Sequence, residues 1–153
     1  MLVYLVNILL IIVWALVFSV GKHTQVKKII FVVICFVQLY LISAYRYNIG
    51  ADYKMYADGF FNMAIDVSRN GFNLTGYEDW EIGFILFNKI IAVFTADSSI
   101  FFVISSLLPL IGPAYLIIKH SGSPFISIFL YVNLYLFYLD INFVRQGIAM
   151  SIL

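Results

Sequence analysis

Long apolar runs constrain this chain more than any other feature of its sequence. The first run covers about residues 2–20 and the second about residues 29–45, and neither contains a charged side chain. Each is close to the roughly 20 residues that a helix needs to cross the hydrocarbon core of a bilayer. Hydrophobic residues make up 63% of the 153 residues and charged residues only 11%, which leaves too few polar groups to cover a soluble domain. The sequence therefore predicts an all-α, polytopic transmembrane helical bundle.

Later apolar segments extend this single membrane domain over residues 1–153. They cover about residues 82–96, 100–118 and 125–139, and another begins at residue 147. The segment 82–96 is short for a span and could be re-entrant. Pro109, Gly112 and Pro113 are expected to kink or break the segment 100–118. Because the last run stops about two turns after it begins, where a spanning helix leaves carbonyl groups unsatisfied, we expect a protein truncated at its C-terminus.

The basic residues between the apolar runs predict which side of the membrane each loop faces. The short loop between the first two runs contains Lys22, His23, Lys27 and Lys28. Loops rich in lysine and arginine stay in the cytoplasm, so the next loop, residues 46–81, is predicted to be extracytoplasmic. If the segment 82–96 crosses the membrane, Lys119 lies outside and Arg145 inside. If it does not cross, Lys119 lies inside and Arg145 joins Arg46 on the outer face, which fits the positive-inside rule better and is favoured.

The outer loop contains a predicted amphipathic helix over residues 52–70. Its apolar face carries Tyr56, Phe60, Met63, Ala64 and Val67. Charged and amide side chains recur on the opposite face, and Gly71 is a typical C-terminal stop. We expect this helix to lie on the membrane surface with its aromatic face in the lipid boundary. Trp80, near the end of the loop, suits the interfacial aromatic belt.

The first part of the outer loop carries the densest group of candidate binding residues. It reads RYNIGADYKMYADGF from Arg46 to Phe60, so that a guanidinium, a glycine and a carboxylate fall within seven residues. Such a set can bind an anionic, hydroxyl-rich ligand, with Arg46 on a diphosphate and Asp52 accepting a proton from a hydroxyl or helping to ligate a divalent ion. Tyr53 and Tyr56 are placed to stack on sugar rings. We expect Arg46 and Asp52 to lie together at the outer rim of the bundle.

Each of these residues also has a purely structural alternative. Arg46 can extend to lipid headgroups from the end of its span. Asp52 can cap the helix that follows it. Tyr53 and Tyr56 can be interfacial anchors, which is the common role of tyrosine at a membrane boundary.

Further polar residues lie where later segments meet the membrane. Glu81 directly precedes an apolar segment, and a carboxylate at such a boundary is costly unless it is used. Asn88 and Lys89 lie deeper in that segment, where the lysine either extends to the interface or faces a polar cavity. Arg145 and Gln146 separate two apolar segments, and a second guanidinium beside the first would suit a diphosphate.

Several classes of site are not indicated by the sequence. His23 and His120 are isolated and Cys35 is the only cysteine, so the sequence predicts neither a metal site nor a disulfide. No cofactor motif is evident, and the need for a divalent cation stays open. The net charge of +1 does not indicate nucleic acid as a partner.

Four segments occur in a fixed order after the first two apolar runs. They are RYNIGADYKMYADGF, EIGFILFNKII, FFVISSLL and VRQGIA. This order resembles the EpsG family, membrane proteins of bacterial exopolysaccharide and capsule assembly that are grouped with Wzy-type polysaccharide polymerases. The resemblance covers essentially the whole chain and corresponds to the N-terminal part of a family member. One departure is Ile82 after Glu81, where the family often has proline.

The resemblance implies a multi-pass protein of the bacterial cytoplasmic membrane that performs glycosyl transfer on its outer face. The implied substrate is an undecaprenyl-diphosphate-linked oligosaccharide, with membrane lipids and other exopolysaccharide-assembly proteins as further partners. The candidate catalytic residues are Asp52 and Glu81, and the candidate substrate-binding residues are Arg46, Gly50, Tyr53, Tyr56, Asn88, Arg145 and Gln146. In this interpretation the two arginines neutralise the departing diphosphate, and one carboxylate orients or deprotonates the acceptor hydroxyl.

Two other interpretations remain open. The chain could be a non-enzymatic transporter or flippase-like carrier, with Asn88, Lys89 and the break between Pro109 and Pro113 lining a path. Transport predicts essential residues at mid-membrane, whereas polymerisation predicts them in the outer loop. Alternatively, the chain as it stands has no activity without further helices.

Overall fold

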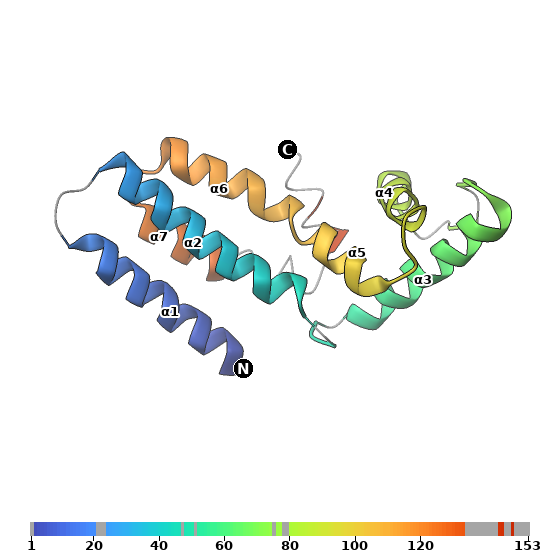
Figure 1. The fold of residues 1–153 in the computed structure, drawn as a ribbon, viewed down its shortest axis with the longest axis horizontal. Coiled ribbons are helices and arrows are strands. Elements are labelled where there is room, and N and C mark those ends of the chain that lie inside the picture. The colour runs from blue at the N-terminus through green and yellow to red at the C-terminus, as the bar shows by residue number, and fades with distance from the viewer. Residues whose placement is uncertain are drawn as a thin grey trace.

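The computed structural model describes residues 2–20, 24–46, 48–50, 52–74, 76–77, 80–133, 144–145 and 148. Within these residues the chain forms α-helices and no strand, as predicted (Figure 1). In chain order the helices are α1 (Leu2–Ser19), α2 (Gln25–Ala44), α3 (Tyr53–Asn70), α4 (Ile82–Ala92), α5 (Ser98–Ser105), α6 (Leu108–His120) and α7 (Pro124–Tyr131).

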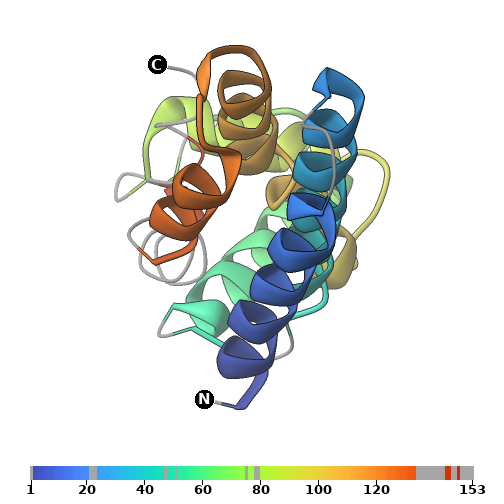
Figure 2. The same cartoon turned by 90° about the vertical axis from the view of Figure 1, so that its left-hand side faces the viewer.

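Helices α1, α2, α6 and α7 lie alongside one another and form a bundle (Figures 1 and 2). Helix α6 runs antiparallel to α2. Lys28, near the start of α2, donates to the Ser121 carbonyl after α6 at 2.5 Å, while Ser43, near the end of α2, donates to the Ser106 hydroxyl before α6 at 3.1 Å. The buried core of the bundle consists of Ile11, Phe31, Val32, Cys35, Phe36, Leu39, Leu110, Ile117, Ile128 and Val132.

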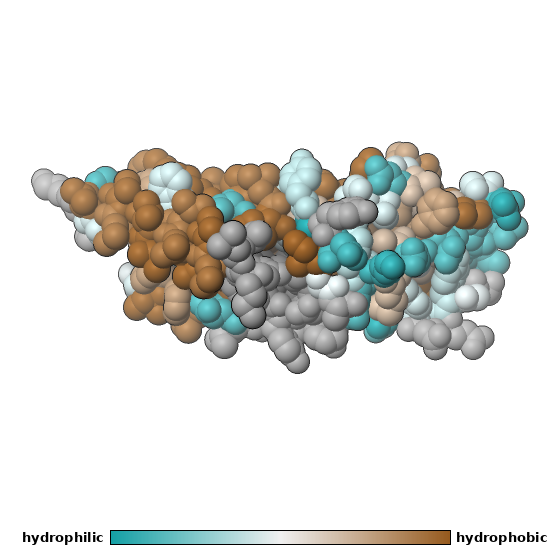
Figure 3. Space-filling model, turned by 90° about the horizontal axis from the view of Figure 1, so that it is seen from below, coloured by the Kyte–Doolittle hydropathy of each residue, from teal (hydrophilic) through white to brown (hydrophobic). Residues whose placement is uncertain are grey.

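The outer surface of the bundle is apolar. Large side chains such as Leu9, Leu16 and Val37 are exposed on α1 and α2, and Figure 3 shows a mostly hydrophobic surface over the bundle end of the molecule. An apolar surface of this extent suits lipid rather than water. Two helical stretches, Gln25–Ala44 and Ser98–His120, are long and apolar enough to cross a bilayer. The described residues thus contain fewer full spans than the sequence predicts.

Helices α3, α4 and α5 share a second buried core near the C-terminal end of α2, and we call this unit the head. Helix α5 also packs on α2, since the Tyr40 hydroxyl donates to the Val103 carbonyl at 3.2 Å. The surface of the head is more hydrophilic than that of the bundle (Figure 3). Its buried core consists of Tyr56, Phe60, Phe84, Ile91, Phe101, Phe102, Val144 and Ile148. The rings of Phe60 and Phe101 stack at 4.9 Å between centroids and join α3 to α5.

The predicted helix over residues 52–70 forms as α3, but its aromatic face does not lie in lipid. Tyr56, Phe60, Met63 and Ala64 are buried in the structure, and Tyr56 and Phe60 pack on rings of α4 and α5. The prediction of a surface-lying helix is therefore wrong in this respect. Helical periodicity identifies the apolar face, but it does not say whether lipid or another helix covers it.

The interruption of the predicted span 100–118 lies earlier than expected. Helix α5 ends at Ser105 and α6 begins at Leu108, so the chain turns at residues 106–107. Pro109 occupies the first turn of α6, where a missing N–H removes no helical hydrogen bond. Pro113 lies inside α6, where it takes the N–H donor away from the Pro109 carbonyl. The hydroxyl of Tyr131 in α7 donates to that carbonyl at 3.0 Å and replaces the lost bond.

The predicted segment 82–96 is helical only over Ile82–Ala92, 11 residues, which is too short to cross a bilayer. Lys27 and Lys28 in the first turn of α2 and Lys119 in the last turn of α6 lie at the same end of the bundle, because these helices are antiparallel. This is the arrangement that the non-crossing alternative requires. Of the predicted span that starts at residue 147, the structure describes only Ile148, which is buried in the core of the head.

Candidate functional site

Two of the predicted site residues, Glu81 and Arg145, form an ion pair although 64 positions separate them. Arg145 Nη1 donates to Glu81 Oε2 at 3.0 Å. Glu81 occupies the N-cap position of α4 but makes no capping bond with its side chain, so its carboxylate is directed to the arginine instead. The two side chains are 29% and 68% exposed, and a ligand in solution can reach both.

Tyr56 joins α3 to this pair. Its ring is in edge-to-face contact with the rings of Trp80 and Phe84, at 5.8 and 5.9 Å between centroids. Burial lowers the pKa of the Arg145 guanidinium, but the neighbouring Tyr56 hydroxyl and Glu81 carboxylate outweigh that effect and raise the pKa. The guanidinium therefore remains a fixed positive charge at neutral pH.

Trp80 supports Arg145 and is itself held by a close approach to α3. The guanidinium of Arg145 lies 5.4 Å from the centroid of a Trp80 ring. A Cβ atom at Gly59 would lie 2.8 Å from two atoms of the indole, so only glycine admits the ring at this depth. Sequence reasoning assigned Trp80 to the interfacial belt and did not single out Gly59. Nothing in the sequence indicates that Gly59, in the middle of α3, faces Trp80, because this contact depends on how the helices pack.

Arg46 borders the same aromatic cluster at another point. Its guanidinium carbon lies 4.8 Å from the centroid of the Phe102 ring, on which the Tyr53 ring also stacks at 4.7 Å. Arg46 is only 4% exposed. An arginine that extends to lipid headgroups keeps its charged end in the interface, so this burial argues against that alternative.

The chain turns between Arg46 and α3 through Gly50. The backbone φ of Gly50 is 106°, a value that residues with a side chain rarely adopt. The Gly50 carbonyl accepts a hydrogen bond from the Tyr53 N–H at 3.3 Å. Asp52 follows at the N-cap position of α3, yet its side chain makes no capping bond. Arg46 and Asp52 both lie at the start of the head, and the expectation that they bind one ligand together stays a prediction.

Lys89 is fully buried and ties α4 to α3. Its ammonium donates to Asp66 Oδ2 at 2.6 Å and to the Asn73 carbonyl, and lies 4.9 Å from the centroid of the Tyr77 ring. The bond from Lys89 lowers the pKa of Asp66 below its usual value. The lysine thus neither extends to the interface nor lines an open path. The sequence does not indicate its partner, because Asp66 falls on the polar face of the predicted helix 52–70, opposite the apolar residues.

Asn88 is fully buried and lies on the same face of α4 as Glu81. Its Nδ2 donates to the Phe84 carbonyl at 2.7 Å, while its Oδ1 has no hydrogen-bond partner among the described residues. A buried acceptor left without a donor costs about 1–3 kcal/mol. Positions 81, 84 and 88 follow the spacing of one helical face, so this acceptor is a candidate contact for a ligand or for water.

The remaining predictions concern Gln146 and metal binding. Gln146 lies outside the described residues. In the part of the chain that the structure describes, no group of three or more His, Cys, Asp or Glu side chains is arranged to hold a metal ion.

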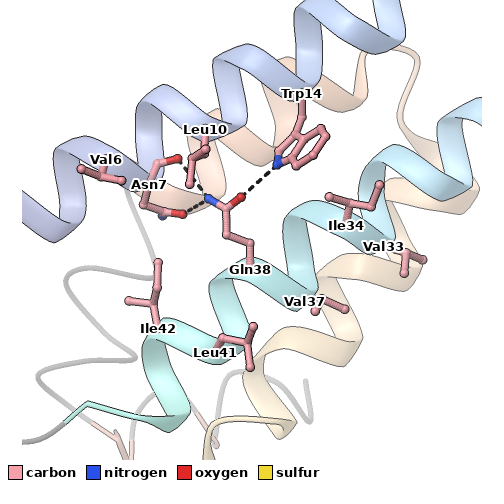
Figure 4. A pocket seen from close by; sticks show the side chains of 10 residues that line it. All are labelled: Val6, Asn7, Leu10, Trp14, Val33, Ile34, Val37, Gln38, Leu41 and Ile42. Carbon is pink, nitrogen blue, oxygen red and sulfur yellow. Dashed lines mark hydrogen bonds between the residues drawn. The ribbon is translucent and has the colours of Figure 1, made fainter.

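A groove between α1 and α2, with a volume of about 630 Å³, lies apart from these residues (Figure 4). Apolar side chains line it, together with a hydrogen-bonded chain of Trp14, Gln38 and Asn7. Trp14 Nε1 donates to Gln38 Oε1 at 3.1 Å, and Gln38 Nε2 donates to Asn7 Oδ1. None of the predicted site residues lines this groove.

Comparison with known proteins identifies a family that this chain matches. The model of the EpsG family matches residues 28–153, a range that contains every predicted site residue and begins within α2. No curated protein and no solved structure matches the chain.

Proposed function

Because this chain belongs to the EpsG family, we propose that it acts in bacterial exopolysaccharide or capsule assembly as a Wzy-like polymerase. Family membership and the apolar helices make it a membrane protein related to exopolysaccharide production. In the proposed role it transfers a growing glycan between undecaprenyl-diphosphate-linked units on the outer face of the cytoplasmic membrane.

The observation that carries this proposal is that Arg46 and Arg145, distant in sequence, contact one continuous row of aromatic rings. Arg46 lies on Phe102 and Arg145 on Trp80. The row runs through Trp80, Phe84, Phe101 and Phe102, with centroid separations of 5.2, 6.3 and 5.1 Å between successive rings. Packed rings hold each guanidinium in place before a ligand arrives. A diphosphate carries enough charge for two guanidiniums, and the proposal requires that one diphosphate reaches both.

The proposed reaction uses one carboxylate and both arginines. A hydroxyl of the incoming unit attacks the anomeric carbon of the growing chain, forming a new C–O bond as the C–O bond to the lipid diphosphate breaks. Glu81, exposed beside Arg145, takes the proton of the attacking hydroxyl. The arginines stabilise the negative charge that develops on the departing diphosphate. Asp52 is the alternative base, since its carboxylate is not used in a helix cap.

The position of the head supports an outer-face site. The head begins where α2 ends, and Lys27 and Lys28 lie in the first turn of that helix. Helix α2 has 20 residues and is therefore about 30 Å long, which is the thickness of the hydrocarbon core. If the lysine end faces the cytoplasm, as the positive-inside rule predicts, the head faces the outer side.

Alanine replacement in the full-length protein tests this proposal. Arg46→Ala and Arg145→Ala are expected to abolish long polymer in cells, measured on gels of extracted polysaccharide, while the protein still inserts in the membrane. The matched control is Arg69→Ala, because Arg69 is exposed in the last turn of α3. Polymer of normal length with either Arg46→Ala or Arg145→Ala would contradict the assignment.

A further inference from the structure

The end of the bundle opposite the head contains a second pocket, of about 660 Å³. It lies between the end of α1, the start of α2 and the loop that joins α6 to α7. Its lining combines basic, hydroxyl and aromatic side chains, and residues at the N-terminus of α7 form part of its wall. None of the residues proposed for polymerisation takes part in it.

Two lysines give this pocket an uncompensated positive charge. Lys27 Nζ donates to the Val20 carbonyl at 2.8 Å, and Lys28 Nζ donates to the Ser121 carbonyl at 2.5 Å. Both acceptors are neutral main-chain groups, and no acidic residue occurs among the described residues that line the pocket. These bonds hold the two ammonium groups at fixed places beside the pocket without cancelling their charge.

The other wall of the pocket is aromatic. Phe18, Phe31 and Phe125 line it, and the rings of Phe18 and Phe31 lie 5.9 Å apart between centroids. Phe125 is itself partly exposed, and its ring lies 6.2 Å between centroids from the ring of the exposed Phe129, so an apolar surface that suits lipid chains leads from the pocket along α7. A free phosphate ion would use the lysines but not this surface, whereas a phospholipid would use both.

The depth of the pocket also matches a lipid headgroup. Lys27 and Lys28 lie in the first turn of α2, one of the two stretches long enough to cross a bilayer, so their ammonium groups lie at the edge of the hydrocarbon. Anionic lipid headgroups bind basic pockets between helices at this depth on the cytoplasmic side.

We propose that this pocket binds an anionic phospholipid, with the phosphate between Lys27 and Lys28 and the acyl chains along Phe18 and Phe125. Lys28 already joins α2 to the loop after α6. A lipid held there would link α1, α2 and the α6–α7 loop, and would stabilise the basic end of the bundle. This inference is independent of the function proposed for the head.

Titration of the purified full-length protein with phosphatidylglycerol, followed by native mass spectrometry and thermal unfolding, tests the proposal. We expect phosphatidylglycerol to bind and raise Tm, and phosphatidylcholine to do neither. Lys27→Gln should weaken binding of phosphatidylglycerol about fivefold, the effect typical of one basic residue near an anionic membrane surface. Lys28→Arg, which keeps the charge, should bind close to wild type.

Lys119→Gln is the matched control. Lys119 lies at the same end of the bundle, but its ammonium donates to the Tyr115 hydroxyl at 2.9 Å and it does not line the pocket. Equal binding of phosphatidylcholine, or unchanged affinity in Lys27→Gln, would overturn the proposal. An increase in Tm with inorganic phosphate that equals the increase with phosphatidylglycerol would indicate a free-anion site and would overturn it too.

Discussion

Gly59 decides whether the indole of Trp80 can reach the position in which it supports Arg145. The missing side chain lets the ring lie against the backbone of α3, where a Cβ would be 2.8 Å away. Trp80 also stacks on Phe84 at 5.2 Å. The absence of a side chain at Gly59 thus helps to position Trp80 in the candidate site. Gly59 lies in α3, which carries neither Glu81 nor Arg145.

Gly59→Ala is expected to displace Trp80 and to lower polymer formation. In an unhindered helix, Gly→Ala stabilises by about 1 kcal/mol, but here the clash with the ring opposes that gain. The displacement can be followed by tryptophan fluorescence in a Trp14→Phe background, where Trp80 is the only fluorophore of its kind.

Gly83→Ala is the matched control for this prediction, because nothing lies within 4 Å of a Cβ added to Gly83 in α4. It should leave Trp80 fluorescence unchanged and raise Tm slightly. If Gly59→Ala and Gly83→Ala behave alike, the close approach of Trp80 to α3 does not matter to the site.

At the scale of helices, the sequence predicts where a helix forms better than it predicts which other helices pack against it. The bounds of α3 differ from the predicted helix by one residue, because periodicity and Gly71 mark both ends. The sequence predicts lipid on the aromatic face of α3, because nothing in the segment 52–70 itself indicates the rings of α4 and α5 that cover this face. The break after α5 was placed at prolines, yet Pro113 is accommodated within α6 because α7 supplies a donor.

The hydrogen bond from the Tyr131 hydroxyl of α7 to the Pro109 carbonyl of α6 predicts that substitutions in these two helices have coupled effects on stability. Tyr131→Phe should destabilise the protein by about 1–3 kcal/mol, because it leaves a buried carbonyl without a donor while keeping the stack on Phe36. In a Pro113→Ala background the alanine N–H can bond to the same carbonyl, and Tyr131→Phe should then cost much less. Thermal unfolding of the four proteins measures this coupling.

The two outcomes of that cycle are distinct. A coupling close to zero would mean that the Pro109 carbonyl is satisfied in another way when Tyr131 is absent. A large coupling would show that α7 compensates for the proline inside α6.

At the scale of the whole molecule, the candidate site and the basic pocket lie at opposite ends of α2. The sequence predicts which residues lie at each end of this helix. Lys27 and Lys28 indicate the cytoplasmic end, and the motif that starts at Arg46 indicates the end that carries the head. The sequence does not predict that Glu81 pairs with Arg145 or that Lys89 pairs with Asp66, because each pair joins segments whose packing depends on the aromatic core of the head.

This arrangement predicts opposite labelling of the two ends in intact cells. A cysteine at His120 should react with an impermeant thiol reagent only after the membrane is opened, whereas one at Arg69 should react at once. The native Cys35 is buried and gives little background. Labelling of position 120 from outside would place the basic end on the outer face and would remove the proposed location of the candidate site.

The polar chain through Trp14, Gln38 and Asn7 has a consequence for how this protein enters the membrane. Gln38 lies in the middle of α2, and both of its amide atoms find partners on α1. The two helices emerge from the ribosome one after the other, so the amide can be matched as soon as the second helix arrives. In the proposed multi-pass topology, the hairpin of α1 and α2 would therefore enter lipid with both amide atoms of Gln38 already bonded.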